Sequence, residues 1–435
     1  MRHLILLPLC LTLSLPALAE TEQEDWQIKG QGTYVWQKSE SFRSPYSDQH
    51  SLAADGESGY TFTSTLFAGI RPWRGGEIYL NIEAGKGSPL SGLDGLGGFT
   101  NGEATRVSGT QLKAYRQRLF LRQTWNLGGT SETVESAFNQ MAGTVDHDRF
   151  VLTLGNFSTL DIFDNNAYAK DPRTQFLNWS NMANAAFDYA ADARGFGWGF
   201  AGEWYQGDWA FRFGRMTGPL EPNGPKVDDQ ILRHYGDQIE LEHSHQIGDL
   251  PGKIRLLAWR NRAKLAAFRD ASALLDSQPN TQAIMNVRNG EKIKYGFGIN
   301  IEQALSADLG FFLRAMHADG RTETYAFTEV DGSLASGLSL KGAAWGRADD
   351  TVGLAWMRNT ISQDRRDYLA KGGISFFIGD GALNYRPESI IETYYSWKVT
   401  PGLWLSGDYQ HIANPAYNAD RGPANITSLR VHAEF

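Results

Sequence analysis

Charged and amide side chains gather in two stretches of this sequence. Arg116, Arg118 and Arg122 are separated by even numbers of residues, two and four, in one alternating segment. The polar segment 158–194 supplies carboxylates, amides, two arginines and a tryptophan, namely Asp161, Asp164, Asn165, Asp171, Arg173, Asn178, Trp179, Asp188, Asp192 and Arg194. Arginines that face carboxylates across a narrow space filled with water would set up a transverse field. Such a field orients water and polar solutes, and rings of charge in a pore bias what passes.

The segment 195–216 shows what could carry these groups. Residues 195–205 place Phe196, Trp198, Phe200 and Trp204 on one face and glycines with Glu203 on the other. After the turn 206–208, Trp209, Phe211 and Phe213 alternate with Ala210, Arg212 and Gly214. Alternation with period two predicts β-strands. Aromatic residues that face outward, with glycine and charge inside, are typical of a barrel in a membrane.

The segment 158–194 connects two such strands and is 37 residues long. A connection of this length in a compact fold is usually functional. We therefore predict a loop that folds inward and narrows the channel of the barrel. Glu203 and Arg212 would face the same channel from the wall.

The arginine series lies in a predicted strand, Leu112–Asn126, which carries Tyr115, Leu119, Leu121 and Trp125 on its other face. Three arginines facing lipid would cost several kcal/mol near the middle of a membrane. We expect all three to face the lumen. The alternative is a position near the rim, where the cost is small.

The chain of 435 residues begins with features of a secretory signal, since Arg2 and His3 precede an apolar run that ends at Ala17-Leu18-Ala19. We expect residues 1–19 to be removed and residues 20–435 to form one domain. The only cysteine is Cys10, so the mature chain cannot rely on disulfides. No mature segment approaches 18 apolar residues, which excludes spanning helices. A net charge of −8 argues against a nucleic-acid partner.

Tight turns and long connections alternate along the chain. The count gives 16 strands, seven short connections and eight long loops, which is the pattern of an outer-membrane barrel. Residues 127–149 are long for a short turn, and Glu135–Gly143 could add strands, so 18 strands is the alternative. The last strand, Asn425–Phe435, alternates Leu429, Val431 and Ala433 with polar residues and ends in Phe435. Such an end resembles the signal that barrel-assembly machinery reads in Gram-negative bacteria.

Several stretches resemble the carbohydrate-selective porin family (OprB-like). They include Gln31–Gln37, Pro89–Leu93, Arg118–Thr124, Asp161–Asn166, Asp171–Trp179, Phe187–Gly195, Pro251–Leu257, Thr322–Thr324, Gly337–Gly342, Asp367–Leu369 and Asn414–Asn418. The resemblance covers nearly the whole mature chain. It implies an all-β transmembrane barrel of about 16 strands in the outer membrane that passes sugars by diffusion. It implies no catalytic residue, cofactor or resident metal.

Sugar selectivity would need aromatic faces for stacking on a pyranose ring and polar groups for its hydroxyls. Alternatively, most of the loop's charges serve only to tie the loop to the wall. Rival functions are a porin of the same fold for small anions or amino acids, a plugged barrel and an outer-membrane enzyme. No catalytic motif supports the enzyme, and His243 and His245 are the best metal candidates. The expected partners are small sugars, outer-membrane lipid and the assembly machinery, and the sequence leaves monomer and homotrimer open.

Overall fold

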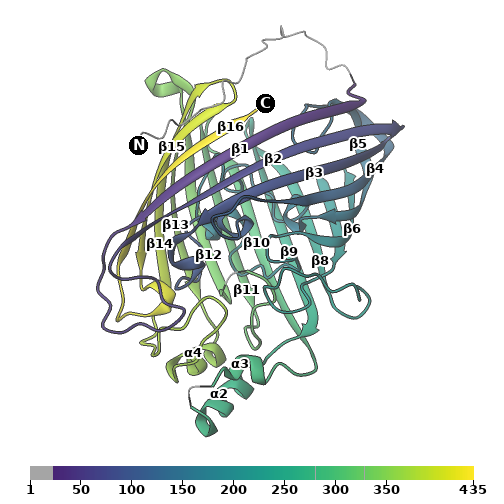
Figure 1. Cartoon of the computed structure of the whole chain (residues 1–435). Coiled ribbons are helices and arrows are strands. Elements are labelled where there is room, and N and C mark those ends of the chain that lie inside the picture. Colours follow the sequence, from purple (N-terminus) through teal and green to yellow (C-terminus); the bar gives the residue numbers. More distant parts are fainter. Residues whose placement is uncertain (1–22, 280, 328) are drawn as a thin grey trace.

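The computed structural model describes residues 23–279, 281–327 and 329–435. The expected signal segment 1–19, with Cys10, lies outside the described residues. Within the described chain, sixteen antiparallel strands form one closed barrel, because β16 pairs with β1 (Figure 1). The predicted 16-stranded all-β barrel is confirmed. The strands are β1 Trp26–Ser39, β2 Glu57–Trp73, β3 Gly76–Ser88, β4 Lys113–Val134, β5 Gly143–Phe157, β6 Gly197–Gln206, β7 Trp209–Met216, β8 Tyr235–Ile247, β9 Leu250–Lys264, β10 Glu291–Ala304, β11 Leu309–Ala318, β12 Gly332–Gly342, β13 Arg347–Thr360, β14 Glu388–Thr400, β15 Leu403–Ala413 and β16 Ala424–Glu434.

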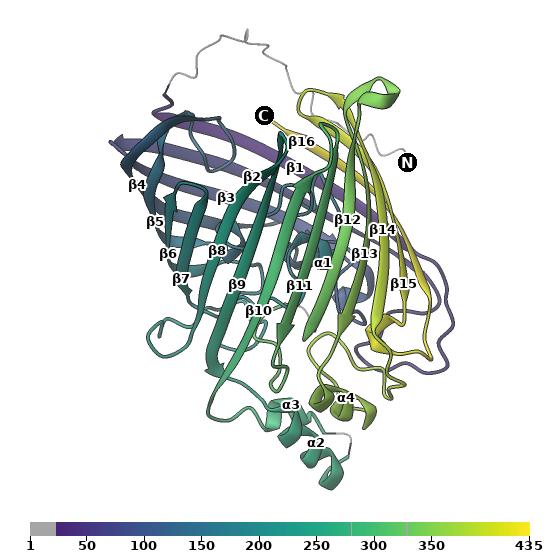
Figure 2. The ribbon, with the colours of Figure 1, turned by 180° about the vertical axis from the view of Figure 1, so that it is seen from behind.

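The two rims of the barrel differ. The strands are joined at one rim by turns such as Gly207-Asp208 and Pro401-Gly402, and at the other by long loops. The long-loop rim carries α2 (Phe268–Ser277), α3 (Ala283–Asn286) and α4 (Gln363–Ala370), which lie below the strands in Figures 1 and 2. None of the helices in the described ranges is long and apolar enough to cross a membrane. In outer-membrane barrels generally, the longer loops lie on the cell exterior.

Side chains alternate between the two faces of the wall as the sequence predicts. In β16, Leu429 and Val431 are exposed on the outer surface, whereas Arg430 and His432 are buried on the inner one. Trp209 and Phe211 are exposed in the same way, with Arg212 inside. Closure into a barrel is what makes this arrangement possible in lipid, because every backbone group along the strands has a partner.

The uncertain segment 127–149 is an extended hairpin. Strand β4 has 22 residues and continues to Val134, and β5 begins at Gly143. Residues 135–142 form the turn, closed by an isolated bridge between Ala137 and Gln140. The 18-stranded alternative is therefore wrong.

A β-bulge in β4 changes the predicted faces of the arginine series. Arg118 pairs with Asn81 and Arg116 with Ile82, so Gln117 is the extra residue. Residues before the bulge consequently have the opposite parity from those after it. Tyr115 and Gln117 point inward and donate hydrogen bonds to Glu83. Arg116 points outward, where its guanidinium lies 5.0 Å from the ring of Trp198.

The expectation that Arg116 faces the lumen is thus wrong, and so is the outward placement of Tyr115. Arg116 lies near the long-loop end of β4, where outward charge costs little. Phe196 also departs from its predicted face. It precedes β6 and is 3% exposed, beneath the inward guanidinium of Arg118.

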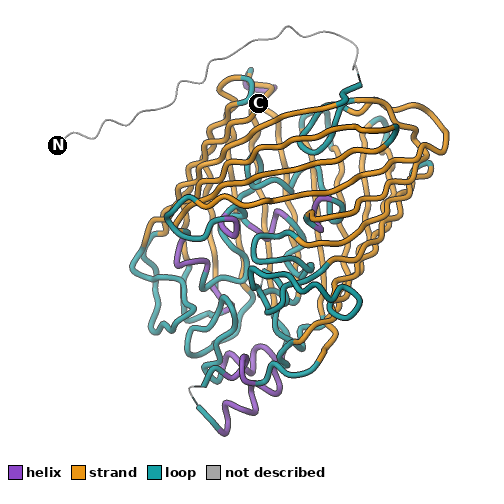
Figure 3. Tube along the Cα trace, turned by 45° about the vertical axis from the view of Figure 1, so that its right-hand side comes forward, coloured by secondary structure: helices purple, strands orange, loops and turns teal. Residues whose placement is uncertain are grey.

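Loops occupy much of the barrel interior. Figure 3 shows the loops (teal) gathered in the half of the barrel next to the long-loop rim, while strands (orange) continue beyond them to the other rim. Loop 158–196 carries many buried side chains, among them Phe163, Phe176, Leu177 and Trp179. The predicted inward fold of this loop is confirmed, and it divides the lumen into an outer half and an inner half.

Candidate functional site

Loop 158–196 begins at the end of β5 with a well-formed cap. The Ser158 hydroxyl accepts a hydrogen bond from the Leu160 amide, and the Asp161 carboxylate accepts one from the Ser158 amide. This reciprocal capping satisfies the free amides at the start of the short helix Thr159–Asp161. It also turns the chain away from the wall, so the loop enters the lumen directly after β5.

Carboxylates on the far wall hold the backbone of the loop. Glu240 accepts a hydrogen bond from the Asp164 amide at 2.8 Å, and Glu302 accepts one from the Ala167 amide at 2.8 Å. Glu392 accepts hydrogen bonds from the amides of Leu177 (2.6 Å) and Asn178 (2.9 Å). Irregular backbone inside a protein must find partners for its polar groups. The inward carboxylates of β8, β10 and β14 provide those partners.

Cations on the wall bind the carbonyl groups of the same loop. Arg314 donates to the carbonyl oxygen of Asn181 at 2.6 Å and to that of Asp164 at 3.1 Å. Arg430 donates to the carbonyl oxygens of Pro172 (2.6 Å) and Gln175 (2.7 Å). The wall therefore binds both the amide and the carbonyl groups of the loop backbone, and these contacts fix the path of the loop across the lumen.

Four of the predicted site residues belong to this clamp. Asp164, Asn178 and Asp188 are at most 2% exposed, and Trp179 is 3% exposed. Asp188 accepts hydrogen bonds from two amides of the loop 319–331 and lies 3.0 Å from the Lys294 ammonium. Trp179 stacks on Phe327 with ring centroids 4.9 Å apart. These four side chains hold the loop in place and have almost no surface to offer a solute.

Arg118 of β4 and Asp161 of the loop form a direct ion pair. The Arg118 guanidinium donates two hydrogen bonds to the Asp161 carboxylate, at 2.8 and 2.7 Å. It also lies 4.9 Å from the centroid of the Phe196 ring. Burial alone would raise the pKa of Asp161, but the Arg118 charge outweighs that effect and keeps the pKa below its ordinary value. A guanidinium and a carboxylate are therefore fixed together next to a buried aromatic ring.

Other predicted residues of the loop lie on either side of this pair. Arg194 lies over the ring of Tyr115 at 4.2 Å, and Asp192 accepts hydrogen bonds from the amides of Arg194 and Phe196. Asn165 is exposed, with its side-chain oxygen 2.7 Å from the Lys170 ammonium.

Arg173 binds Glu103 at 3.1 Å and approaches Glu83 at 3.7 Å, which joins loop 158–196 to the loop 89–112 and to β3. Asp171 caps the turn that leads into Arg173, because the Asp171 carboxylate accepts a hydrogen bond from the Arg173 amide at 3.0 Å.

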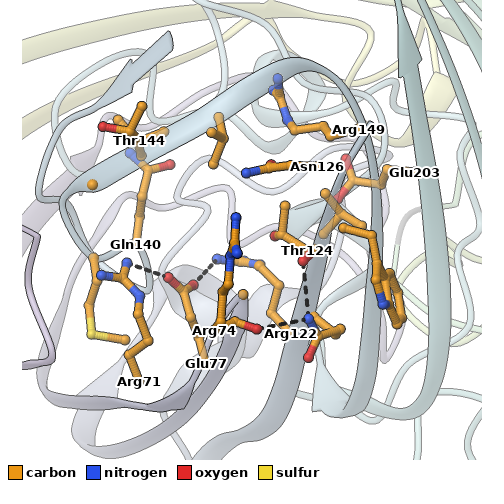
Figure 4. Close-up of a pocket in the computed structure, with 18 of the residues that line it drawn as sticks. Arg71, Arg74, Glu77, Arg122, Thr124, Asn126, Gln140, Thr144, Arg149 and Glu203 are labelled. Atoms are coloured by element: carbon orange, nitrogen blue, oxygen red, sulfur yellow. Dashed lines mark hydrogen bonds and ion pairs between the residues drawn. The ribbon is translucent and has the colours of Figure 1, made fainter. Parts of the chain in front are cut away.

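A cavity of about 1100 Å³ opens on the short-turn side of the loop. The turns of β2–β3 and β4–β5 line it on one side, and Asp161, Ile162 and Asn165 line it from the loop. Figure 4 shows the polar side chains that point into it, with Glu77 between Arg71 and Arg122. The Glu77 carboxylate lies 2.8 Å from Arg71 and 3.7 Å from Arg122. We name this cavity the inner vestibule.

Glu203 and Arg212 lie on the wall of the inner vestibule. Arg212 donates to Glu203 at 3.1 Å, to Glu240 at 2.9 Å and to Glu242 at 3.2 Å. Arg255 and Lys253 also bind Glu242, at 2.6 and 3.1 Å, so this wall carries a network of ion pairs. The arginines on the opposite side of the vestibule lie across from this network, and the predicted transverse field stays a prediction.

The sequence analysis missed two side chains beside these groups. Lys170 lies in the same loop as the predicted site residues, and as a charged residue of that loop it could have been predicted with them. Arg149 lies in the segment that was read as an uncertain turn, and its guanidinium is 4.2 Å from the Tyr205 ring. Its position at the vestibule follows only once β4 and β5 are known to form one long hairpin.

A comparison with family profiles decides what kind of channel this is. The profile described as "Carbohydrate-selective porin, OprB family" matches residues 49–435. The chain belongs to the OprB family. This OprB-family porin is thus a carbohydrate-selective channel of the Gram-negative outer membrane and not an enzyme.

Solved structures share the fold of this porin. OprB of Pseudomonas putida superimposes with a TM-score of 0.69 at 18% identity, over 94% of each chain. The outer-membrane channel DcaP of Acinetobacter baumannii superimposes with a TM-score of 0.52 at 10% identity, over 94% of this porin and 97% of DcaP. At these identities the likeness shows the barrel fold alone. No curated protein matches this porin.

The two histidines considered as metal ligands lie on the outer surface of the barrel. His243 stacks on Trp209 with ring centroids 4.3 Å apart, and His245 hydrogen-bonds Gln303 at 2.9 Å. Across the described ranges, no group of three ligand-type side chains is arranged to hold a metal ion. The pair instead forms part of the aromatic band near the short-turn rim.

Lys170 predicts a pH dependence of ion selectivity in this porin. Burial lowers the pKa of Lys170 to about 8, although the nearby Asp161 charge opposes the shift. Below that pH the side chain is positive, and above it the side chain is neutral. We expect the preference for anions, measured as reversal potential in a KCl gradient, to fall between about pH 7 and pH 9. Lys170→Gln should show the high-pH value throughout, and an unchanged titration in this variant would contradict the assignment.

Proposed function

We propose that this porin passes mono- and oligosaccharides by passive diffusion along one path beside loop 158–196. The path would run from Arg194 and Asp192 at the outer side, past Arg118 and Asp161, into the inner vestibule. The residues proposed to line it are Arg118, Arg122, Asp161, Asn165, Lys170, Asp192, Arg194, Glu203 and Arg212. Partial exposure of most of these side chains next to the vestibule supports this choice.

The observation that carries the proposal is the ion pair of Arg118 and Asp161 beside Phe196. Guanidinium and carboxylate groups are fixed there as donor and acceptor for sugar hydroxyls, while the Phe196 ring, 3% exposed, supports the guanidinium from behind and offers no surface for stacking. A sugar needs hydrogen-bond donors and acceptors close together, whereas an inorganic ion needs only charge. Binding at such a point must remain weak for the solute to leave.

A second candidate is a channel for small anions, because Arg71, Arg74, Arg122 and Arg149 all line the inner vestibule. Conductance in planar bilayers separates the two. Purified porin would be titrated with glucose, maltose, succinate and arginine while the open current is recorded. Saturable block by a sugar is expected. Block by succinate alone would replace sugars with anions, and the absence of any current from folded protein would overturn the channel path.

We also propose that the barrel-assembly machinery recognises the β16 strand through Phe435. The terminal residue is 79% exposed and pairs with Gly30 of β1 through two backbone hydrogen bonds of 2.9 and 3.1 Å. Removing Phe435 should lower the amount of heat-modifiable porin in outer membranes while leaving refolding in detergent unchanged. Equal loss in both assays would instead assign Phe435 to barrel closure.

A further inference from the structure

An excess of positive charge lies on the outer surface of the barrel at the long-loop ends of β7–β10. Arg215, Arg260, Arg262 and Lys264 point outward from the wall, and Arg233 reaches the same surface from the loop 217–234. We name these five side chains the basic patch. Of these strands, β9 and β10 are joined by the segment that carries α2 and α3, in the lower part of Figure 2.

The basic patch begins where the apolar band of the barrel ends. On the same outward face, Ile239, Leu256 and Phe297 are 51%, 53% and 59% exposed. Ile239 and Phe297 lie one outward-facing row closer to the membrane centre than Arg260, and Leu256 lies one row further. The register places Arg260 beside Tyr295 and Arg262 beside Ile293. Outward apolar side chains contact acyl chains, so the guanidiniums that follow them lie at the level of the lipid headgroups.

The acids that pair with the basic patch cannot neutralise it. Asp237 is shared by Arg215 and Arg260, at 2.6 and 2.9 Å. Glu291 is shared by Arg233 and Arg262. Two carboxylates therefore stand against five cations, and Lys264 is exposed at the register position of Glu291.

The guanidiniums are also held in place before any ligand arrives. The ring of Tyr235 is 8% exposed, with the Arg215 guanidinium 3.8 Å and the Arg260 guanidinium 5.7 Å from its centroid. Arg260 nevertheless keeps 53% of its side chain exposed. A guanidinium that is oriented yet accessible is suited to bidentate binding of phosphate.

The short-turn rim offers a contrast with the same residue types. There Arg347 faces outward beside Trp397 and binds Asp350, which no second arginine shares among the described ion pairs. Charge at that position is balanced one to one. The excess of positive charge is thus found at the long-loop rim, which faces the outer leaflet. The main lipid of that leaflet in Gram-negative bacteria is a glycolipid whose head carries phosphates.

We infer that the basic patch binds the phosphate groups of lipid A in the outer leaflet. The phosphates would contact Arg260, Arg262 and Lys264, while the acyl chains lie along the apolar band below. This surface faces away from the lumen, so the inference is independent of which sugar the channel passes.

The test uses the double variant Arg260→Gln with Arg262→Gln. Each shared acid keeps one arginine, because Asp237 retains Arg215 and Glu291 retains Arg233, so no carboxylate is left unpaired. Purified porin in detergent would be titrated with bisphosphorylated lipid A and followed by native mass spectrometry. We expect binding to weaken about 30-fold for the two lost cations. Arg347→Gln, at the opposite rim, should bind as the unmodified porin does.

Further measurements distinguish binding of lipid A from binding of free phosphate and from contacts between subunits. Monophosphorylated lipid A should bind more weakly than the bisphosphorylated form, and inorganic phosphate at the same concentration should not compete. Unchanged conductance and heat modifiability would show that the double variant is folded. Equal binding by all three proteins would overturn the inference. A change of oligomeric state in the double variant without a change in lipid A binding would assign the patch to a contact between subunits and also overturn it.

Discussion

Replacing Glu392 with alanine is expected to free loop 158–196 and to raise the single-channel conductance of this porin. The Glu392 carboxylate is fully buried and accepts hydrogen bonds from the amides of Leu177 and Asn178 and, at 2.7 Å, from the Asn181 side chain. Each buried donor that loses its partner costs about 1–3 kcal/mol. Three such donors amount to a large share of the free energy that keeps a loop folded.

The conservative variant Glu392→Gln provides the matched control. Its carbonyl oxygen can still accept from the two backbone amides, while its amide group opposes the Asn181 amide. We expect a smaller rise in conductance and a smaller fall in the temperature of heat modification than in Glu392→Ala. If Glu392→Ala kept both the conductance and the unfolding temperature of the unmodified porin, the loop would not depend on this clamp.

The wall of the barrel could be predicted from the sequence because its signal is local. Period-two alternation in segments such as 195–216, and turns such as Pro401-Gly402, follow from neighbouring residues alone. Strand number and the two unlike rims follow from the order of those segments. In 197–216 and in β4 after its bulge, the lipid-facing and lumen-facing sets were therefore assigned correctly.

Face assignment failed where the strand is irregular. The residues around Gln117 do not predict a β-bulge, because the position of the bulge is set by the pairing of β4 with β3. One extra residue reverses the parity of everything before it, so Arg116 and Arg118 share a predicted face and yet lie on opposite sides of the wall. Strict counting from Arg122 back to Arg116 could not detect this.

The roles within loop 158–196 could not be predicted either, because they depend on contacts distant in sequence. Asn178 and Asp192 are of similar type and both stand in the loop. Asn178 is buried because its amide group donates to Gln410 at 2.9 Å, more than 200 residues later. Asp192 remains partly exposed beside Arg194. The length of the loop predicted a functional segment, and only its contacts with the folded wall distinguish its buried anchors from its exposed residues.

Replacing Arg118 with glutamine is expected to shift the channel from anion toward cation preference and to weaken block by sugars. The change removes one positive charge from the proposed path and leaves the Asp161 carboxylate without its main partner. The loop should stay in place, because Asp161 still accepts the Ser158 amide at 2.9 Å. Hydrogen bonds from a charged donor contribute about 1.5–3 kcal/mol. If one is made to the sugar, its loss weakens block about tenfold or more.

Arg116→Gln is the control that the bulge supplies. Arg116 lies two residues before Arg118 on the same strand but faces outward over Trp198, so its loss should leave reversal potential and sugar block unchanged. Reversal potential in a KCl gradient and titration of the current with maltose measure both variants. Equal effects of the two substitutions would mean that charge near this end of β4 acts at long range. An effect of Arg118→Gln alone would locate selectivity at the pair of Arg118 and Asp161, since the two variants change the same charge on opposite sides of one wall.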